Sequence, residues 1–337
     1  MKIARDQLGY SINLMTFRDI ARSACSAIAL TVIVALGAAA CQSTSDSEMA
    51  IGPSQSASTT GAAQGSSNAP TQYGNVVAPN PTPVSFGGAS RSNASAPAIT
   101  AKAAILIDNY GRVLFEKNAD THLPVASTQK LLLGILIAEN GNLGQPITIQ
   151  DADTWAEPTV MGIKTGQVYT REELLRTVLV RSSNDIARAL ARDHSGSVSA
   201  FAGSMNQRAR QLGMNNSYFT NASGLPNPAG QYSTARDLSK LCSAALRNPF
   251  VRDSIKTKAV VFRFSTGTTK TVYNTNLVLR DFPYCTGAKT GYTNAAGKCL
   301  VSSATYNRRS VIAVILGSKS PNVWNESEAL LKFGLGM

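Results

Sequence analysis

The stretch Ser127-Thr-Gln-Lys-Leu-Leu-Leu-Gly-Ile-Leu-Ile-Ala-Glu-Asn140 predicts a helix that is stopped by Gly141. Nearly every side chain after Lys130 is apolar, so this helix has no face suited to water. A helix that is apolar all round is typical of a protein interior. We therefore expect this segment to be the central, buried helix of a domain, with other elements packed around it.

Helical patterns continue along the chain after this segment. Helices are expected over residues 171–181, from about 185 to 191, over 198–212 and over 326–333. The first of these has Thr170 as a candidate N-cap and Glu173 at the capping-box position. Its apolar residues fall on one face, and they are Leu174, Leu175, Val178 and Leu179.

Strand signals lie towards both ends of the same region. Asn109-Tyr-Gly111 separates the apolar runs 103–108 and 112–116 and so predicts a hairpin. Further strands are expected over residues 259–264, 270–273, 287–290, 298–304 and 310–317. Hairpins at both ends and helices between them indicate an α+β fold, in which an antiparallel sheet built from N- and C-terminal strands packs against a helical subdomain.

The start of the 337-residue chain has the pattern of an export signal. Residues 27–41 are apolar but too few for a membrane-spanning helix, which needs about 20 residues. Ala38-Ala-Ala-Cys41 resembles a bacterial lipobox. We interpret residues 1–40 as a signal peptide, with Met15 as a possible true start. Cleavage before Cys41 would leave a lipidated cysteine, and the alternative is a secreted protein cut nearby.

Residues 41–97 consist mostly of Ser, Ala, Gly, Pro and Asn. Such a segment cannot bury enough apolar surface to offset its ordering entropy, so we interpret it as a disordered tether. Residues 98–337 remain as the folded domain. We expect an exported protein, periplasmic or otherwise extracytoplasmic, that is held at a membrane as a lipoprotein.

Charge and cysteine content restrict the partners further. The net charge of +12 comes without an aromatic-basic readout motif, so no nucleic-acid partner is expected. A basic surface suits an anionic wall polymer or a membrane face, or has no specific partner.

Beyond the signal and Cys41, the cysteines are Cys242, Cys285 and Cys299. Either Cys285 and Cys299 pair across a hairpin, or all three are buried thiols.

A serine and a lysine three residues apart form the first chemical motif. On a helix, Ser127 and Lys130 share one face. A serine hydroxyl becomes a nucleophile when a base takes its proton, and lysine is a base only when its pKa is lowered. Burial and a second cation lower it, and Lys289 could be that cation. The chain has only two histidines, His122 and His194, and this chemistry needs neither.

Two further short motifs complete a possible acyl-transfer site. Ser182-Ser-Asn184 offers a hydroxyl that can relay a proton and an amide that can hold a substrate carbonyl or the lysine. Lys289-Thr-Gly291 offers a cation and a hydroxyl to a carboxylate, and glycine allows close approach. A second copy, Lys164-Thr-Gly166, is interpreted as a surface turn. The N–H groups of Ser127 and Tyr292 could form an oxyanion hole.

With these motifs in this order, the chain resembles the serine-type D-alanyl-D-alanine carboxypeptidases, the low-molecular-mass penicillin-binding proteins of peptidase family S11. The matching segments are Pro124–Lys130, Arg181–Asp185, Phe219–Leu225, Tyr232–Asp237, Asn274–Asn276 and Gly287–Thr293. The resemblance implies a β-lactamase/transpeptidase-like fold and β-lactams as covalent inhibitors. It also implies a nucleophile at Ser127, a base at Lys130, a relay at Ser182 and Asn184, and substrate binding at Lys289, Thr290, Gly291 and Tyr292. No metal or organic cofactor is implied.

Two departures from the family pattern stand out. Tyr292 occupies a position where several relatives carry histidine. The chain also ends soon after Phe333, whereas well-known relatives continue into a second, all-β domain and a C-terminal anchor. We therefore expect the N-terminal segment to provide the anchor.

The expected activity is removal of the terminal D-alanine from peptidoglycan stem pentapeptides. An endopeptidase that cuts cross-links is the alternative, and a non-enzymatic wall-binding lipoprotein is a third. A β-lactamase is disfavoured, because the nearby glutamates Glu157, Glu172 and Glu173 all precede Ser182.

Overall fold

The computed structural model describes residues 95–337. Our interpretations of the signal peptide, of Cys41 and of most of the tether lie outside these residues. The described part contains a five-stranded antiparallel sheet of order β2-β1-β9-β8-β7. Its strands are β1 (Ala103–Asp108), β2 (Val113–Lys117), β7 (Cys285–Thr293), β8 (Gly297–Tyr306) and β9 (Arg309–Ser318). The N-terminal and C-terminal strands thus form one sheet, as the sequence predicts.

Helices cover both faces of this sheet. On one face lie α5 (Ala235–Arg247) and α6 (Pro249–Lys256), and on the other lie α7 (Leu277–Asp281) and α8 (Asn322–Leu335). The side chains of β1 alternate between the two resulting cores: Ile105 and Ile107 belong to the larger core, and Ala104 and Leu106 to the core beneath α8. Because both faces are buried, β1 has no polar face.

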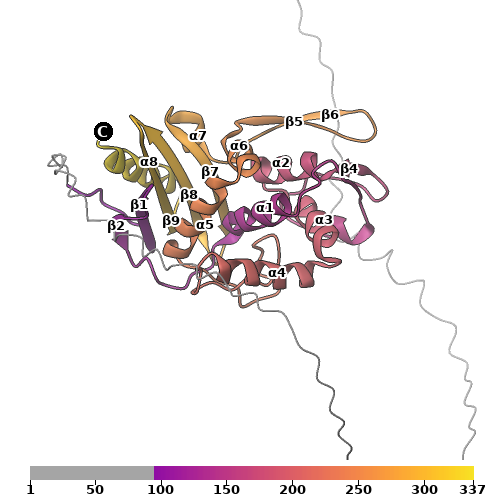
Figure 1. Ribbon diagram of the computed structural model, residues 1–337, viewed down its shortest axis with the longest axis horizontal. Coiled ribbons are helices and arrows are strands. Elements are labelled where there is room, and N and C mark those ends of the chain that lie inside the picture. The colour runs from indigo at the N-terminus through magenta and orange to yellow at the C-terminus, as the bar shows by residue number, and fades with distance from the viewer. Residues whose placement is uncertain (1–94) are drawn as a thin grey trace, which may run out of the picture. The chain divides into compact units, whose positions relative to one another are not determined.

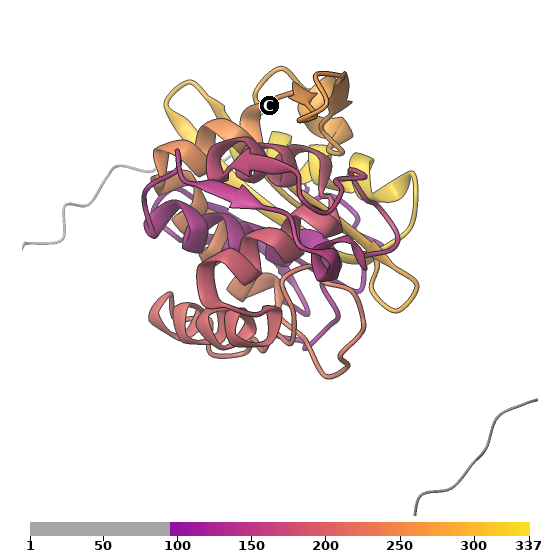
Figure 2. The ribbon, with the colours of Figure 1, turned by 90° about the vertical axis from the view of Figure 1, so that its right-hand side faces the viewer.

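A helical lobe packs beside the sheet and surrounds α1 (Lys130–Glu139) (Figure 1). The helices α2 (Arg171–Arg181), α3 (Asn184–Ser195), α4 (Val198–Gln211), α5 and α6 all contact α1. Most of α1 is buried, which confirms the prediction of a central helix. Figure 2 shows the lobe from its outer side. Within residues 95–337, no helix is long and apolar enough to cross a bilayer.

The N-cap and the apolar face of α2 form as the sequence predicts. Thr170 caps the helix: its side chain accepts the N–H of Glu173, and the Glu173 carboxylate accepts the N–H of Thr170. The four apolar residues of its predicted inner face are all buried. The helix ends at Arg181, and its C-cap residue Ser182 has a φ of +70°, which breaks the helical path before α3 begins at Asn184.

Several boundaries and elements differ from the sequence-based expectations. A short 3-10 turn, η1 (Ala126–Gln129), precedes α1, so Ser127 lies just before the α-helix. The hairpin of β5 (Ala259–Arg263) and β6 (Thr269–Tyr273) forms a separate two-stranded sheet. The same is true of β3 (Pro146–Thr148) and β4 (Val168–Thr170), which we did not predict. We also did not predict α5, α6 and α7, although Thr234, Asn248 and Asn276 cap them with their side chains.

The cysteines in the described residues are three buried, free thiols. Cys285 lies opposite Ala304 in the β7–β8 ladder, whereas Cys299 lies opposite Gly291. The two cysteines therefore do not face each other, and the alternative of a disulfide between them is wrong.

Candidate active site

Ser127 lies in η1, where the chain enters the central helix. The preceding residue, Ala126, is buried and has a φ of +49°, a left-handed conformation that is uncommon for alanine. The Thr128 hydroxyl donates to the Val125 carbonyl at 2.7 Å, which fixes the turn locally. As a first-turn residue, Ser127 has an N–H that no helical carbonyl can accept. The turn therefore presents both the hydroxyl and the N–H of one residue.

Two glycines press against this turn from neighbouring segments. A Cβ on Gly291, in β7, would lie 3.0 Å from the Ser127 nitrogen and 2.8 Å from the Val125 oxygen. A Cβ on Gly224 would lie 2.2 Å from the Ala126 oxygen, and Gly224 has a φ of +88°. The position of Ser127 thus depends on the absence of side chains at both glycines.

Lys130 is completely buried, and its Nζ contacts three oxygen atoms. The Nζ donates to the Ser127 Oγ at 2.8 Å, to the Asn184 Oδ1 at 2.7 Å and to the Ser223 carbonyl at 2.6 Å. The Ser127 Oγ also lies 3.1 Å from the Ser223 carbonyl. A serine hydroxyl and a lysine amine are therefore held at hydrogen-bonding distance without water between them.

Burial lowers the pKa of Lys130 well below its usual value, and the positive charge of Lys289 lowers it further. The carboxylate of Asp185 acts in the opposite direction. Burial also lowers the pKa of Lys289, to about 7. The interpretation of Lys289 as the second cation thus agrees with the electrostatics of the site.

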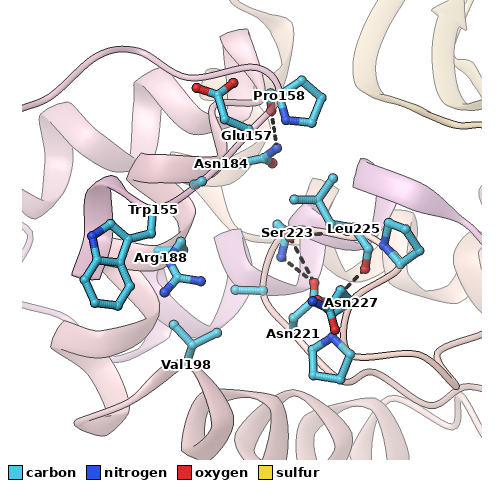
Figure 3. Close-up of a pocket in the computed structure, with 14 residues that line it drawn as sticks. Trp155, Glu157, Pro158, Asn184, Arg188, Val198, Asn221, Ser223, Leu225 and Asn227 are labelled. Carbon is cyan, nitrogen blue, oxygen red and sulfur yellow. Dashed lines mark hydrogen bonds between the residues drawn. The ribbon is translucent and has the colours of Figure 1, made fainter. Parts of the chain in front are cut away.

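Ser182 and Asn184 extend the cluster from the α2–α3 junction. The Lys289 Nζ donates to the Ser182 Oγ at 2.8 Å, while Asn184 accepts from Lys130. The Asn184 Nδ2 donates to the Pro158 carbonyl (Figure 3), and its backbone N–H donates to the Thr159 carbonyl. The amide is thus fixed from two directions.

The segment Lys289–Tyr292 belongs to β7, an edge strand of the main sheet. Lys289 is buried, and the Thr290 hydroxyl lies 2.6 Å from that of Thr275. Tyr292 is 57% exposed, so its ring is not buried in the lysine cluster. An edge strand leaves backbone groups for an extended peptide to pair with. The other Lys-Thr-Gly copy is a turn with Lys164 exposed, as predicted.

Two residues to which the sequence analysis gave no role, Asn221 and Asp185, position parts of the site. Asn221 Oδ1 accepts the N–H groups of Ser223 and Gly224, which folds residues 221–224 into a tight turn and directs the Ser223 carbonyl at Lys130. Asp185 is buried and accepts the N–H groups of Met161 and Gly162, so it holds the loop that contacts Asn184. An Asn-x-Ser-Gly sequence signals such a turn, but it does not reveal where the carbonyl points.

This geometry agrees with what sequence comparison finds. Residues 90–320 match the D-alanyl-D-alanine carboxypeptidase family, Peptidase S11. The chain belongs to this family. It is therefore a serine peptidase with the fold of the penicillin-binding proteins.

Individual relatives agree with the family assignment. The chain is 34% identical to the D-alanyl-D-alanine carboxypeptidase DacB2 of Mycobacterium tuberculosis over 67% of its own length and 79% of the relative. It is 33% identical to a D-alanyl-D-alanine endopeptidase of Escherichia coli over 68% of its length and 74% of that protein. The DD-transpeptidase of Streptomyces K15 superposes with a TM-score of 0.69 at 31% identity, covering 72% of this chain and 100% of the other.

Gly224→Ala should displace η1 and lower the rate of covalent reaction at Ser127 by about 100-fold, since a misplacement of 1 Å can have such an effect. The matched control is Gly230→Ala in the same loop. Gly230 also has a positive φ, of +95°, but no atom lies within 4 Å of its added Cβ. Penicillin-labelling rates of the two variants test the prediction, and equal losses in both would contradict it.

Proposed function

We propose that this family member removes the terminal D-alanine from peptidoglycan stem pentapeptides, with Ser127 as the nucleophile and Lys130 as its base. The observation that carries the assignment is the hydrogen bond between the buried Lys130 Nζ and the Ser127 Oγ. A neutral lysine at this distance can take the hydroxyl proton directly. The lowered pKa of Lys130 supports that role, because a lysine with its ordinary pKa would be protonated and unable to act as a base.

In the first half-reaction, the Ser127 Oγ attacks the carbonyl carbon of the penultimate D-alanine while its proton moves to Lys130. The N–H groups of Ser127 and Tyr292 stabilise the resulting oxyanion. The C–N bond then breaks, and the proton held by Lys130 passes through Ser182 to the leaving amine, which departs as D-alanine and leaves Lys130 neutral again. In the second half-reaction, water attacks the carbonyl carbon of the acyl-serine ester while Lys130 takes a proton from that water, and the bond from this carbon to the Ser127 Oγ then breaks as Lys130 returns the proton to the Oγ. The products are the shortened peptide and a regenerated serine.

Lys289 and Thr290 hold the terminal carboxylate of the substrate. The side-chain amide of Asn184 forms a hydrogen bond with the peptide group that precedes the scissile bond. The same geometry accommodates β-lactams, whose carboxylate takes the place of the peptide's. Cleavage of cross-links is a second candidate function. It is favoured by the 33% identity to the E. coli endopeptidase.

Ser127→Ala should abolish both D-alanine release from a synthetic pentapeptide and covalent penicillin labelling. Ser183→Ala is the matched control, because the buried Ser183 hydroxyl has no hydrogen-bond partner within the described residues. We expect this control to retain both activities. Labelling that persists in Ser127→Ala would refute the nucleophile assignment. Release from cross-linked dimers but not from the pentapeptide would favour the endopeptidase.

The preference for a free C-terminal carboxylate should depend on pH. The pKa of Lys289 is about 7, so Lys289 carries its positive charge at lower pH and loses it as the pH rises through that value. The ratio of kcat/KM for a carboxylate substrate to that for its amide should therefore fall as the pH passes through about 7. Both substrates use the same base, so the titration of Lys130 cancels in this ratio.

Lys289→Ala should remove the preference at every pH, and Lys164→Ala, in the exposed copy of the motif, should leave it unchanged. A ratio that does not vary with pH in the wild type, or a large loss in Lys164→Ala, would contradict the anchoring role of Lys289.

We also infer from the sequence that Cys41 is lipidated and that the segment up to residue 97 tethers the enzyme outside the cytoplasm. Cys41→Ser should move the full-length protein from the membrane fraction to the soluble fraction. Cys25→Ser is the control, because Cys25 lies within the proposed signal peptide. A Cys41→Ser protein that stays with the membrane would refute the lipid anchor.

A further inference from the structure

A pocket of about 440 Å³ lies next to the Ser127–Lys130 cluster. It shares Asn184 and Ser223 with the cluster, and no residue of β7 lines it. Its walls come from residues 155–158, from α3, from the start of α4 and from the loop 221–228 (Figure 3). The pocket therefore borders the reaction site at Asn184 and Ser223.

Arg188 is the cation in this pocket. It lies on α3 four residues after Asn184, so both side chains leave the same face of the helix. Its Nε donates to the Ala152 carbonyl at 3.0 Å, which fixes the guanidinium where Figure 3 shows it, between Trp155 and the 221–228 loop. Within residues 95–337 no carboxylate pairs with it, and its two Nη groups have no hydrogen-bond acceptor.

The next arginine on the same helix shows the contrast. Arg192 is one turn further along α3, and its guanidinium is occupied: it pairs with the buried carboxylate of Asp153 at 2.8 Å and donates to the Thr148 carbonyl. Arg192 thus has a structural partner within the fold. Arg188 is half-buried and keeps a free donor edge towards the pocket. An anionic group with two oxygen atoms fits that edge.

The remaining walls are largely apolar. Trp155 is 67% exposed and forms one side, while Val198, Leu225 and Pro226 contribute further apolar surface. An exposed tryptophan beside a cleft is a common feature of binding sites. Glu157, the carboxylate among the lining residues, lies exposed at the rim and is not paired with Arg188. The pocket thus combines an apolar passage with a cation at its side.

We infer that this pocket binds the side chain of the stem residue before D-Ala-D-Ala, and that Arg188 selects a side chain ending in a carboxylate, as in diaminopimelate. This inference rests on the proposed function. With the terminal carboxylate at Lys289 and the scissile carbonyl at Ser127, the preceding part of the peptide passes Asn184 and Ser223 and reaches the pocket that these residues share. The aliphatic part of the side chain packs against Trp155, and its carboxylate pairs with the guanidinium.

Two pentapeptides that differ by this one carboxylate test the inference. One carries meso-diaminopimelate before D-Ala-D-Ala, and the other carries lysine. Loss of a hydrogen bond to a charged group lowers kcat/KM by about 10-fold or more. We expect the wild type to prefer the diaminopimelate peptide by at least that factor. The preference should fall close to one in Arg188→Gln and be partly kept in Arg188→Lys, which retains the charge but not the planar fork.

The control variant is Arg210→Gln, an exposed arginine near the far end of α4, which should keep the full preference. Penicillin labelling of Ser127 reports whether each variant is folded. An unchanged preference in Arg188→Gln, or no preference in the wild type, would overturn the inference.

A second readout separates this inference from the proposed function. Each peptide is added as a competitor, and the slowing of penicillin labelling measures its binding without turnover. If neither peptide releases D-alanine, the carboxypeptidase activity is refuted. Stronger competition by the diaminopimelate peptide, lost in Arg188→Gln, would then still support the pocket. Equal competition by both peptides would refute it.

Discussion

Two lysine side chains, Lys130 and Lys289, are withdrawn from water into one cluster, and much of the domain serves to hold them there. Burying an ammonium group costs several kcal/mol unless other groups replace its hydration. The replacements come from widely separated parts of the chain. Lys130 contacts oxygens of η1, α3 and the 221–224 turn, and Lys289 links β7 to the end of α2. The cluster therefore connects the sheet with the helical lobe.

The same burial explains why the surrounding backbone is strained. Ala126 and Ser182 both have positive φ, and each lies at a point where the chain must turn sharply to present a hydroxyl to a lysine. Such conformations cost about 1–3 kcal/mol each and persist only where the surroundings determine them. The surroundings are the buried helix α1, the close contacts of Gly224 and Gly291, and the loop held by Asp185. Stability elsewhere thus maintains a geometry that the local sequence alone would not adopt.

The contrast between local sequence and long-range contacts also explains what could be predicted from the sequence. The strands that form the sheet, the central helix and the Thr170 cap follow from periodicity and local side-chain chemistry, and they were predicted. The three motifs also come together as expected. Helices α5 and α6 were not predicted, although Thr234 and Asn248 provide ordinary cap signals for them.

Other features had no local signal that could reveal them. The Ser223 carbonyl beside Lys130, the register that separates Cys285 from Cys299, and the orientation of Arg188 all depend on contacts between distant segments.

The choice between trimming and cross-link cleavage depends on a part of the site that Lys289 does not reach. In a pentapeptide the leaving amine is D-alanine, and in a diaminopimelate cross-link it is the amine of a second stem. In both, the carbon that bears the nitrogen also bears a carboxylate, so the proposed carboxylate anchor, Lys289 and Thr290, would meet the same group. The two leaving groups differ only beyond that carbon, where D-alanine ends in a methyl group and the second stem continues. In β7, Tyr292 directly follows Lys289-Thr-Gly291, and its exposed ring has the Lys298 ammonium 4.4 Å from its centre. The two activities therefore differ in the room that the site leaves beyond that carbon, and not in the anchoring of the carboxylate.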